Sequence, residues 1–348
     1  MIDKSPKFIA ETATAASLRT IILTLVTYSR NESLMKVLVT GAAGFIGSSI
    51  AHRLLDRGYD VCGIDSITDY YDPALKKSNL SRLDARRFHF VESDINTTEL
   101  SGLLEDVQVV IHQAGQPGVR KSWGRDFEDY MDSNVRATQK LLESVKESNS
   151  VKKFIYASSS SLYGNAETYP TTETAVPLPR SPYGVTKLAA EHLCGVYAQN
   201  YGVNTVALRY FTVYGPRQRP DMAFTRFCKA AATGGKITVY GDGKQIRDFT
   251  YIDDVVAANI AAIYADTKPG AVMNIAGGSS VSVNDVLALI QQFAPSDLNV
   301  EYIGSALGDV FRTGGDTSRA REVLDWRPAV TLEEGLRSQY LWAKENFV

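Results

Sequence analysis

The chain of 348 residues contains only three cysteines and four histidines. Cys62, Cys194 and Cys228 lie far apart, and no pair has the C-x-x-C spacing of a zinc or redox site. The histidines are equally scattered and include no H-E-x-x-H motif. These shortages argue against a disulfide framework and a catalytic metal, and they favour a reducing, cytoplasmic location.

The chain also lacks an excess of charge and a long apolar run. Its net charge of -2 provides no basic surface for nucleic acid or an acidic membrane, so a small-molecule partner is expected. The apolar run 21–26 follows Lys4, Lys7 and Arg19 like a signal peptide, but it is shorter than the roughly 18 residues that a membrane span needs. We expect residues 1–34 to be a dispensable N-terminal extension.

From Met35 onward, short apolar runs alternate with segments of helical length. The runs lie at residues 37–39, 61–64, 88–91, 109–111, 154–157 and 205–209, and the first helix is expected near 46–57. This alternation predicts an α/β protein with a Rossmann-type, doubly wound parallel sheet. Frequent glycine and proline turns after residue 210 predict a Rossmann domain over 35–210 and a smaller C-terminal α/β domain over 211–348, partly interleaved with the first.

Glycines in the spacing G-x-x-G-x-x-G lie directly between the first predicted strand and helix. Gly41 permits a tight turn, Gly44 lets backbone N–H groups approach a pyrophosphate, and Gly47 lets the helix pack close to the strand. Phe45 and Ile46 open the helix, whose N-terminus favours an anion. The position of the motif therefore predicts a dinucleotide site.

Acidic residues follow the next two predicted strands. Asp65 comes at the distance of about 20 residues at which a carboxylate accepts hydrogen bonds from the adenosine ribose. Its charge repels a 2′-phosphate, which selects NAD over NADP. Asp94 and Ile95 are expected beside the adenine, although an aspartate that caps a helix is an ordinary alternative.

Tyr183 and Lys187 form a Y-x-x-x-K motif, which places both side chains on one face of a helix. A tyrosine titrates near pH 10, so a phenolate at neutral pH requires nearby positive charge, which an ammonium and an oxidised nicotinamide can supply. Tyr183 is then a candidate general base toward a substrate hydroxyl. The serine run 158–161 ends a predicted strand, where a hydroxyl can complete the proton-transfer network.

Together these motifs resemble the NAD-dependent nucleotide-sugar epimerases and dehydratases of the extended short-chain dehydrogenase/reductase type, from Met35 to the C-terminus. Further segments match that pattern in order: His112–Gly115, Asn134, Ser159, Tyr214–Pro216, Gly241–Gly243 and Arg247–Phe249. The resemblance implies a bound, recycled NAD, a UDP-sugar substrate and a homodimer.

The resemblance also implies roles for individual residues. Ser159 is the active-site hydroxyl beside Tyr183, and Lys187 also holds the nicotinamide ribose. Residues expected along the cofactor or the UDP-sugar are Gln113 and Ala114 at the cofactor, Phe211 and Thr212 at the sugar, Arg247 at the diphosphate and Asp309 at the uridine ribose.

Four features narrow the choice within the family. Gly118-Val119-Arg120 replaces the consecutive prolines of UDP-glucuronate decarboxylases and resembles UDP-glucuronate 4-epimerases, with Arg120 expected at the substrate. Thr212 stands where many UDP-glucose 4-epimerases carry asparagine, and residues 211–224 resemble the uronate epimerases. Ser160 and Ser161 occupy the place of the acid pair of dehydratases, which disfavours a 4,6-dehydratase.

The sequence therefore predicts an isomerase that interconverts UDP-glucuronate and UDP-galacturonate by oxidation and re-reduction at C4. Ser160, Ser161 and Thr212 are expected to hold the substrate carboxylate, and Arg219 to assist by its charge unless it is solvated or pairs with Asp221. A UDP-glucose or UDP-N-acetylglucosamine 4-epimerase is the alternative. A UDP-glucuronate decarboxylase and a non-catalytic NAD-binding sensor are less favoured.

Overall fold

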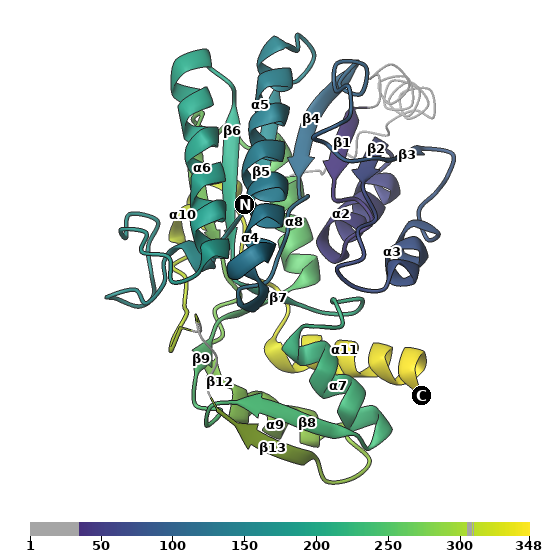
Figure 1. Cartoon of the computed structure of the whole chain (residues 1–348), viewed down its shortest axis with the longest axis vertical. Coiled ribbons are helices and arrows are strands. Elements are labelled where there is room, and N and C mark those ends of the chain that lie inside the picture. The colour runs from purple at the N-terminus through teal and green to yellow at the C-terminus, as the bar shows by residue number, and fades with distance from the viewer. Residues whose placement is uncertain (1–34, 305–307, 309) are drawn as a thin grey trace, which may run out of the picture. The chain divides into compact units, whose positions relative to one another are not determined.

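The computed structural model describes residues 35–304, 308 and 310–348. The predicted extension over residues 1–34 and the predicted ribose contact Asp309 lie outside the described residues. Residues 36–348 form one compact unit. Its element order is given below with the labels of Figure 1.

A parallel sheet of seven strands forms the centre of this unit, in the order β11-β6-β5-β4-β1-β2-β3. The strands are β1 (Lys36–Thr40), β2 (Asp60–Asp65), β3 (Phe88–Glu92), β4 (Val107–His112), β5 (Lys153–Ser159), β6 (Thr205–Tyr210) and β11 (Ala271–Ile275). The first six coincide with the predicted apolar runs, so the predicted fold class is confirmed. The order reverses between β1 and β4, where ligands bind in doubly wound sheets.

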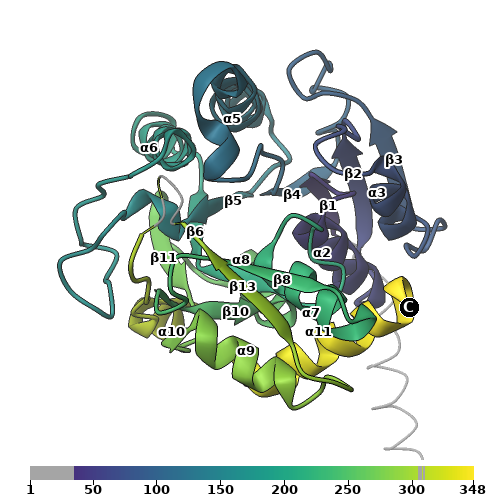
Figure 2. The ribbon, with the colours of Figure 1, turned by 60° about the horizontal axis from the view of Figure 1, so that its bottom comes forward.

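Helices cover both faces of this sheet (Figure 2). On one face lie α5 (Ala137–Glu147) and α6 (Pro182–Tyr201), and on the other lie α2 (Phe45–Asp56) and α8 (Ile252–Tyr264). Every residue of β5 is buried, as expected for a strand with both faces covered. The shorter helical elements near the carboxyl ends of the strands are α3 (Pro73–Leu80), η1 (Arg120–Ser122), η2 (Gly124–Asp126), α4 (Phe127–Tyr130), the π-helix η3 (Met131–Arg136) and η4 (Ser160–Leu162).

Helix α6 has clear start and stop signals in the sequence. The Ser181 side chain accepts a hydrogen bond from the Gly184 N–H at 3.1 Å, and Pro182 occupies the first helical position. At the other end Gly202 adopts a φ of +70°, which glycine tolerates without strain. These ends fix where the Tyr183 and Lys187 side chains emerge.

A smaller group of elements extends beyond the carboxyl ends of the strands (Figure 1). It consists of three two-stranded sheets and three helices: β7 (Thr212–Tyr214) with β10 (Phe249–Tyr251), β9 (Ile246–Arg247) with β12 (Val281–Ser282), β8 (Lys236–Tyr240) with β13 (Asn299–Ile303), and α7 (Ala223–Thr233), α9 (Val283–Gln291) and α11 (Leu332–Phe347). Helix α10 (Ser318–Leu324) instead packs beside the large sheet, against β11 and α8. Because β11 returns to the large sheet, the later part of the chain contributes to both groups. The domain boundary at residue 210 stays a prediction.

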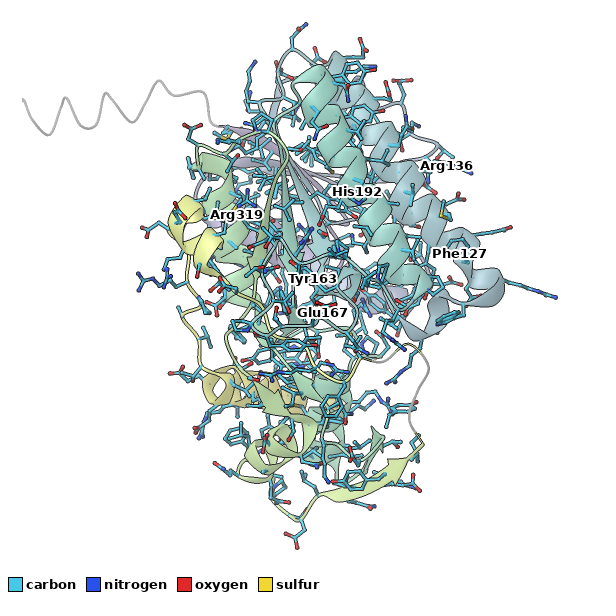
Figure 3. All side chains as sticks on the ribbon, turned by 90° about the vertical axis from the view of Figure 1, so that its left-hand side faces the viewer. Phe127, Arg136, Tyr163, Glu167, His192 and Arg319 are labelled. Carbon is cyan, nitrogen blue, oxygen red and sulfur yellow. The ribbon has the colours of Figure 1, made fainter. Side chains whose placement is uncertain are left out.

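A buried polar network joins the large sheet to α6. Glu191 and Arg209 form an ion pair at 2.6 Å, with both side chains almost fully buried. Ser158 donates a hydrogen bond to Glu191 at 2.5 Å, and Arg209 donates one to the Tyr163 hydroxyl at 2.7 Å. Tyr163, labelled in Figure 3, in turn donates to Asn274 of β11 at 2.7 Å. The network therefore ties β5, β6, β11 and α6 together.

Within residues 35–304, 308 and 310–348, no helix has the length and hydropathy needed to cross a bilayer. The same residues contain no cluster of three or more potential metal-ligating side chains. Cys62, Cys194 and Cys228 are buried and unpaired.

Candidate active site

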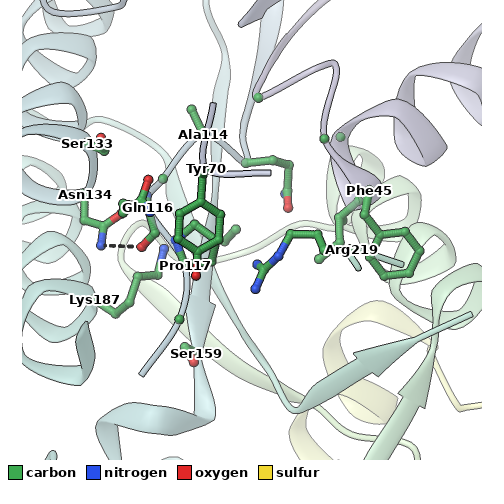
Figure 4. Close-up of a pocket in the computed structure, with 18 of the residues that line it drawn as sticks. Phe45, Tyr70, Ala114, Gln116, Pro117, Ser133, Asn134, Ser159, Lys187 and Arg219 are labelled. Atoms are coloured by element: carbon green, nitrogen blue, oxygen red, sulfur yellow. Dashed lines mark hydrogen bonds between the residues drawn. The ribbon is translucent and has the colours of Figure 1, made fainter. Parts of the chain in front are cut away.

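A cavity of about 490 Å³ lies at the carboxyl ends of the large sheet. Eighteen of the residues predicted for the site line it, namely Gly41, Gly44, Phe45, Ile46, Gly47, Asp65, Asp94, Ile95, Gln113, Ala114, Ser159, Ser160, Ser161, Tyr183, Lys187, Phe211, Thr212 and Arg219. Figure 4 shows Lys187 and Asn134 on one side, Phe45 on the other and the Arg219 guanidinium directed between them. The cavity thus brings together residues that are far apart in the sequence.

The glycine turn leaves room only for backbone. Gly41 has a φ of +65°, and a Cβ atom there would lie 2.8 Å from the Ala114 nitrogen. A Cβ atom on Gly47 would lie 2.1 Å from the Gly41 carbonyl oxygen. Gly44 caps α2 without a side chain, so the first N–H groups of the helix face the cavity unblocked. This cradle fits the pyrophosphate of a dinucleotide.

The carboxylates after β2 and β3 are held by backbone groups. Asp65 accepts hydrogen bonds from Ala43 N at 3.1 Å and Ile67 N at 2.9 Å, one on each oxygen. Each oxygen keeps a further lone pair for a ribose hydroxyl. Asp94 accepts from Asn96 N at 2.8 Å, so it caps a local turn while it also lines the cavity. Asp94 therefore caps a turn and not a helix, and its contact with the adenine stays a prediction.

The catalytic trio predicted from the sequence converges at one end of the cavity. Ser159 ends β5, and its hydroxyl oxygen accepts a hydrogen bond from Ser161 N at 3.1 Å. Its own O–H is thereby left to donate toward Tyr183, with which it interacts. The Tyr130 ring meets the Tyr183 ring edge-on, with centroids 6.1 Å apart. This packing directs the Tyr183 phenol into the cavity wall beside Ser159.

Burial favours the neutral form of both titrating groups of the predicted trio. It raises the pKa of Tyr183, an effect opposed by the Ser159 hydroxyl and the charge of Arg219. It lowers the pKa of Lys187 to about 7, while Cys194 and Glu191 oppose that change. The protein alone therefore does not produce a Tyr183 phenolate at neutral pH. The positive charge of an oxidised nicotinamide fits this requirement.

Asn134 is a site residue to which sequence reasoning gave no role. It lies in the π-helix η3, a rare distortion that often marks functional sites. Its side chain accepts a hydrogen bond from Gln116 N at 2.8 Å and donates to Gln116 O at 3.1 Å and to the Thr186 hydroxyl at 3.0 Å. It thus fixes the loop after β4 against the helix that carries Tyr183.

Other lining residues come from the loop after β2 and from α3, which carries Lys76. Tyr70, Tyr71 and Lys76 line the cavity, and Lys76 donates to the carbonyl and hydroxyl oxygens of Thr68 at 2.8 and 2.9 Å. In Figure 4 the Tyr70 ring stands in front of the loop that contains Pro117. The only signal for them in the sequence is the pair of adjacent tyrosines in an otherwise polar loop.

Arg219 forms a bidentate ion pair with Asp221, with N–O distances of 3.0 and 2.8 Å, which is the alternative to a charge held for the substrate. Arg120 and Arg247 are not part of the cavity wall. Arg120 lies over the Tyr240 ring at 3.8 Å, and Arg247 donates to backbone carbonyls of Ile246 and Phe311 at 2.9 and 3.2 Å. Their substrate contacts stay predictions.

Residues 37–276 match the family model described as the NAD dependent epimerase/dehydratase family. The chain belongs to this family. An uncharacterized UDP-glucose epimerase of Bacillus subtilis is 43% identical over 307 residues, which cover 88% of this chain and 96% of that protein. A UDP-glucuronate 4-epimerase of Thermodesulfobacterium geofontis is 39% identical over 316 residues, covering 89% and 96%.

A solved structure of a relative is also similar to this epimerase/dehydratase. It is the UDP-glucuronic acid 4-epimerase of Bacillus cereus in complex with UDP-glucuronic acid and NAD. The TM-score is 0.86 at 44% identity, and the match covers 89% of this chain and 99% of that one. The family membership and the NAD dependence predicted from the sequence are confirmed.

The glycine cradle generates a prediction about cofactor retention. Gly47→Ala should lower the NAD content of the purified protein by tenfold or more, because the new methyl group collides with the fixed Gly41 carbonyl. Gly195→Ala is the matched control, since Gly195 is also helical and a methyl group there would meet nothing within 4 Å beyond its own stretch of helix. NAD released by acid and measured by chromatography decides the matter. Equal NAD contents would contradict the assignment of the cradle.

Proposed function

We propose that this epimerase/dehydratase is an NAD-dependent 4-epimerase that interconverts UDP-glucuronate and UDP-galacturonate. The observation that carries the proposal is the composition of the wall beside Tyr183, where the hydroxyls of Ser160, Ser161 and Thr212 share one cavity with Tyr183. Several hydrogen-bond donors suit a carboxylate at C5 better than the neutral hydroxymethyl group of UDP-glucose. The substrate named for the relatives from Thermodesulfobacterium geofontis and Bacillus cereus supports the same choice.

In the proposed mechanism, Tyr183 removes the proton of the C4 hydroxyl and Ser159 hydrogen-bonds the same oxygen. Bound NAD supplies hydride chemistry by accepting hydride from C4 and later returning it. The resulting 4-keto sugar turns about its diphosphate linkage, and Tyr183 returns the proton to the C4 oxygen after the turn. Lys187, one helical turn from Tyr183, favours the phenolate while its ammonium form persists.

A panel of UDP-sugars tests this function. The protein should convert UDP-glucuronate to UDP-galacturonate without added NAD and convert UDP-glucose and UDP-N-acetylglucosamine poorly. Tyr183→Phe should lower kcat about 10²–10⁴-fold because it removes the acid/base group. Chromatography of the products is the measurement.

Two results would contradict the proposal in different ways. Preferred conversion of UDP-glucose or UDP-N-acetylglucosamine would identify the alternative 4-epimerase. Binding of UDP-sugars without any conversion would support a non-catalytic sensor.

The carboxylate imposes a second requirement on the site. Oxidation at C4 creates a β-keto acid, which loses CO2 when the scissile bond aligns with the carbonyl π-system. Hydrogen bonds from Ser160, Ser161 and Thr212 are proposed to hold the carboxylate out of that alignment. These three side chains line the cavity, whereas the charge of Arg219 is already paired with that of Asp221.

Thr212→Ala and Ser160→Ala should therefore weaken UDP-glucuronate binding and increase the fraction of UDP-pentose products. Loss of one hydrogen bond to a charged group costs about 1.5–3 kcal/mol, enough to change partitioning about tenfold or more. Released CO2 and the UDP-pentose peak are the measurements. If both variants bind UDP-glucuronate like the parent and release no more CO2, these hydroxyls do not hold the carboxylate.

We also propose that the chain forms a homodimer in the cytoplasm. Val185 and Val196 lie three turns apart on α6, so they share a face, and each is about half exposed. Buried, unpaired cysteines suit a reducing compartment. Sedimentation should find a dimer that Val196→Glu weakens, and a monomeric parent would contradict the proposal.

A further inference from the structure

We propose that Tyr156 is a positioning residue for the reaction: the face of its buried ring supports the Lys187 ammonium and leaves the N–H groups of that lysine free for cofactor and proton transfer. The inference rests on the proposed function for its kinetic meaning. Its geometry is independent of the substrate.

The arrangement places an aromatic face under a buried cation. The Lys187 Nζ atom lies 4.4 Å from the centroid of the Tyr156 ring. Tyr156 is 1% exposed on β5, and Lys187 is 6% exposed on α6. An ammonium at this distance is attracted by the electron-rich face of the ring, and the attraction is strongest where water is excluded.

The ring face stands where a hydrogen-bond acceptor would otherwise be needed. Among the residues that the structure describes, none accepts a hydrogen bond from the Lys187 ammonium, although a buried charge usually has such partners. An aromatic face stabilises the cation without occupying an N–H group. The ammonium therefore keeps its donors for a ribose or for the phenol of Tyr183.

The hydroxyl of Tyr156 contributes nothing visible to this arrangement. It is buried, and it has no hydrogen-bond partner among the described residues. A buried hydroxyl without a partner destabilises a protein, so the ring is the useful part of this side chain. The proposed role of Tyr156 therefore does not depend on a hydrogen bond from its hydroxyl.

Several titratable groups surround Lys187, and each affects its ionisation differently. They are Tyr183, Glu191 and Cys194 on α6, Tyr156 on β5 and His112 on β4. Burial is the main influence and lowers the pKa of Lys187, whereas Cys194 and Glu191 raise it. His112 has its pKa lowered to about 3 by burial, so it carries no charge at neutral pH. The Tyr156 ring opposes the effect of burial without adding a charge.

Four substitutions separate the ring from its surroundings. Tyr156→Phe keeps the ring and removes the unpaired hydroxyl. Tyr156→Leu removes the ring. Phe154→Leu is the matched control, because Phe154 is also buried on β5 and its ring contacts His112 at the same centroid distance of 5.8 Å as Tyr156. Trifluorophenylalanine at position 156 keeps the shape and withdraws electron density from the face.

Two measurements are made on each protein as purified with its cofactor. The ionisation of Lys187 is followed by NMR of lysine labelled with 13C at the ε-carbon, with the signal assigned by its loss in Lys187→Arg. The pH profile of kcat/KM for UDP-glucuronate is recorded in parallel. The first measurement needs no substrate, so a failure of the proposed function does not affect it.

The expected result is an increase of about tenfold in the acid dissociation constant of Lys187 for Tyr156→Leu and for the trifluorinated ring. Tyr156→Phe and Phe154→Leu should titrate like the parent. The limb of the pH profile that reports Lys187 should move in the same direction. The trifluorinated protein decides the question if Tyr156→Leu does not fold.

Three outcomes would overturn the proposal. An unchanged Lys187 titration with the trifluorinated ring would show that the face does not support the ammonium. An equal change in Phe154→Leu would assign the effect to general loosening of the core. A change in Tyr156→Phe as large as that in the trifluorinated protein would assign it to the hydroxyl.

Discussion

The buried carboxylate of Glu191 is the constraint on which the geometry of the site depends. Its charge is held by Arg209 on β6 and by Ser158 on β5, and loss of one partner of such a pair costs about 3–5 kcal/mol. Glu191 lies one helical turn after Lys187, and Ser158 directly precedes Ser159. The same contacts therefore fix α6 along the sheet and set Tyr183 and Lys187 opposite the serine that completes the trio.

The cofactor half of the site was accessible from the sequence because its chemistry is local. The glycine turn, Asp65 and the Tyr183-Lys187 motif each require a particular residue at a short, fixed distance from a strand or along a helix. Such requirements appear as spacing in the chain. The structure places all of these residues around one cavity.

The rest of the site depends on contacts between residues that are far apart in the sequence, and no motif in the sequence indicates such contacts. Tyr70 and Lys76 reach the cavity only because their segment folds back after β2, and the role of Asn134 depends on the π-helical distortion of η3. In the sequence, Tyr156 looks like an ordinary buried residue of a strand. The apolar pattern predicts that its ring is buried, but it does not predict that a lysine lies over the ring. For Arg120 and Arg247 the difference runs in the opposite direction. Their positions in the family pattern predict contact with the substrate, but neither residue is part of the cavity wall.

The return of β11 to the large sheet affects how the chain can fold during synthesis. Ala271–Ile275 pairs with β6 over its whole length, and the Tyr163–Asn274 hydrogen bond closes the polar network behind the serines. Until residue 275 has left the ribosome, β6 remains an uncovered edge that can pair with another nascent chain. Completion of the cofactor-binding sheet must therefore wait until β7, α7, β8, β9 and β10 of the smaller group have also been synthesised.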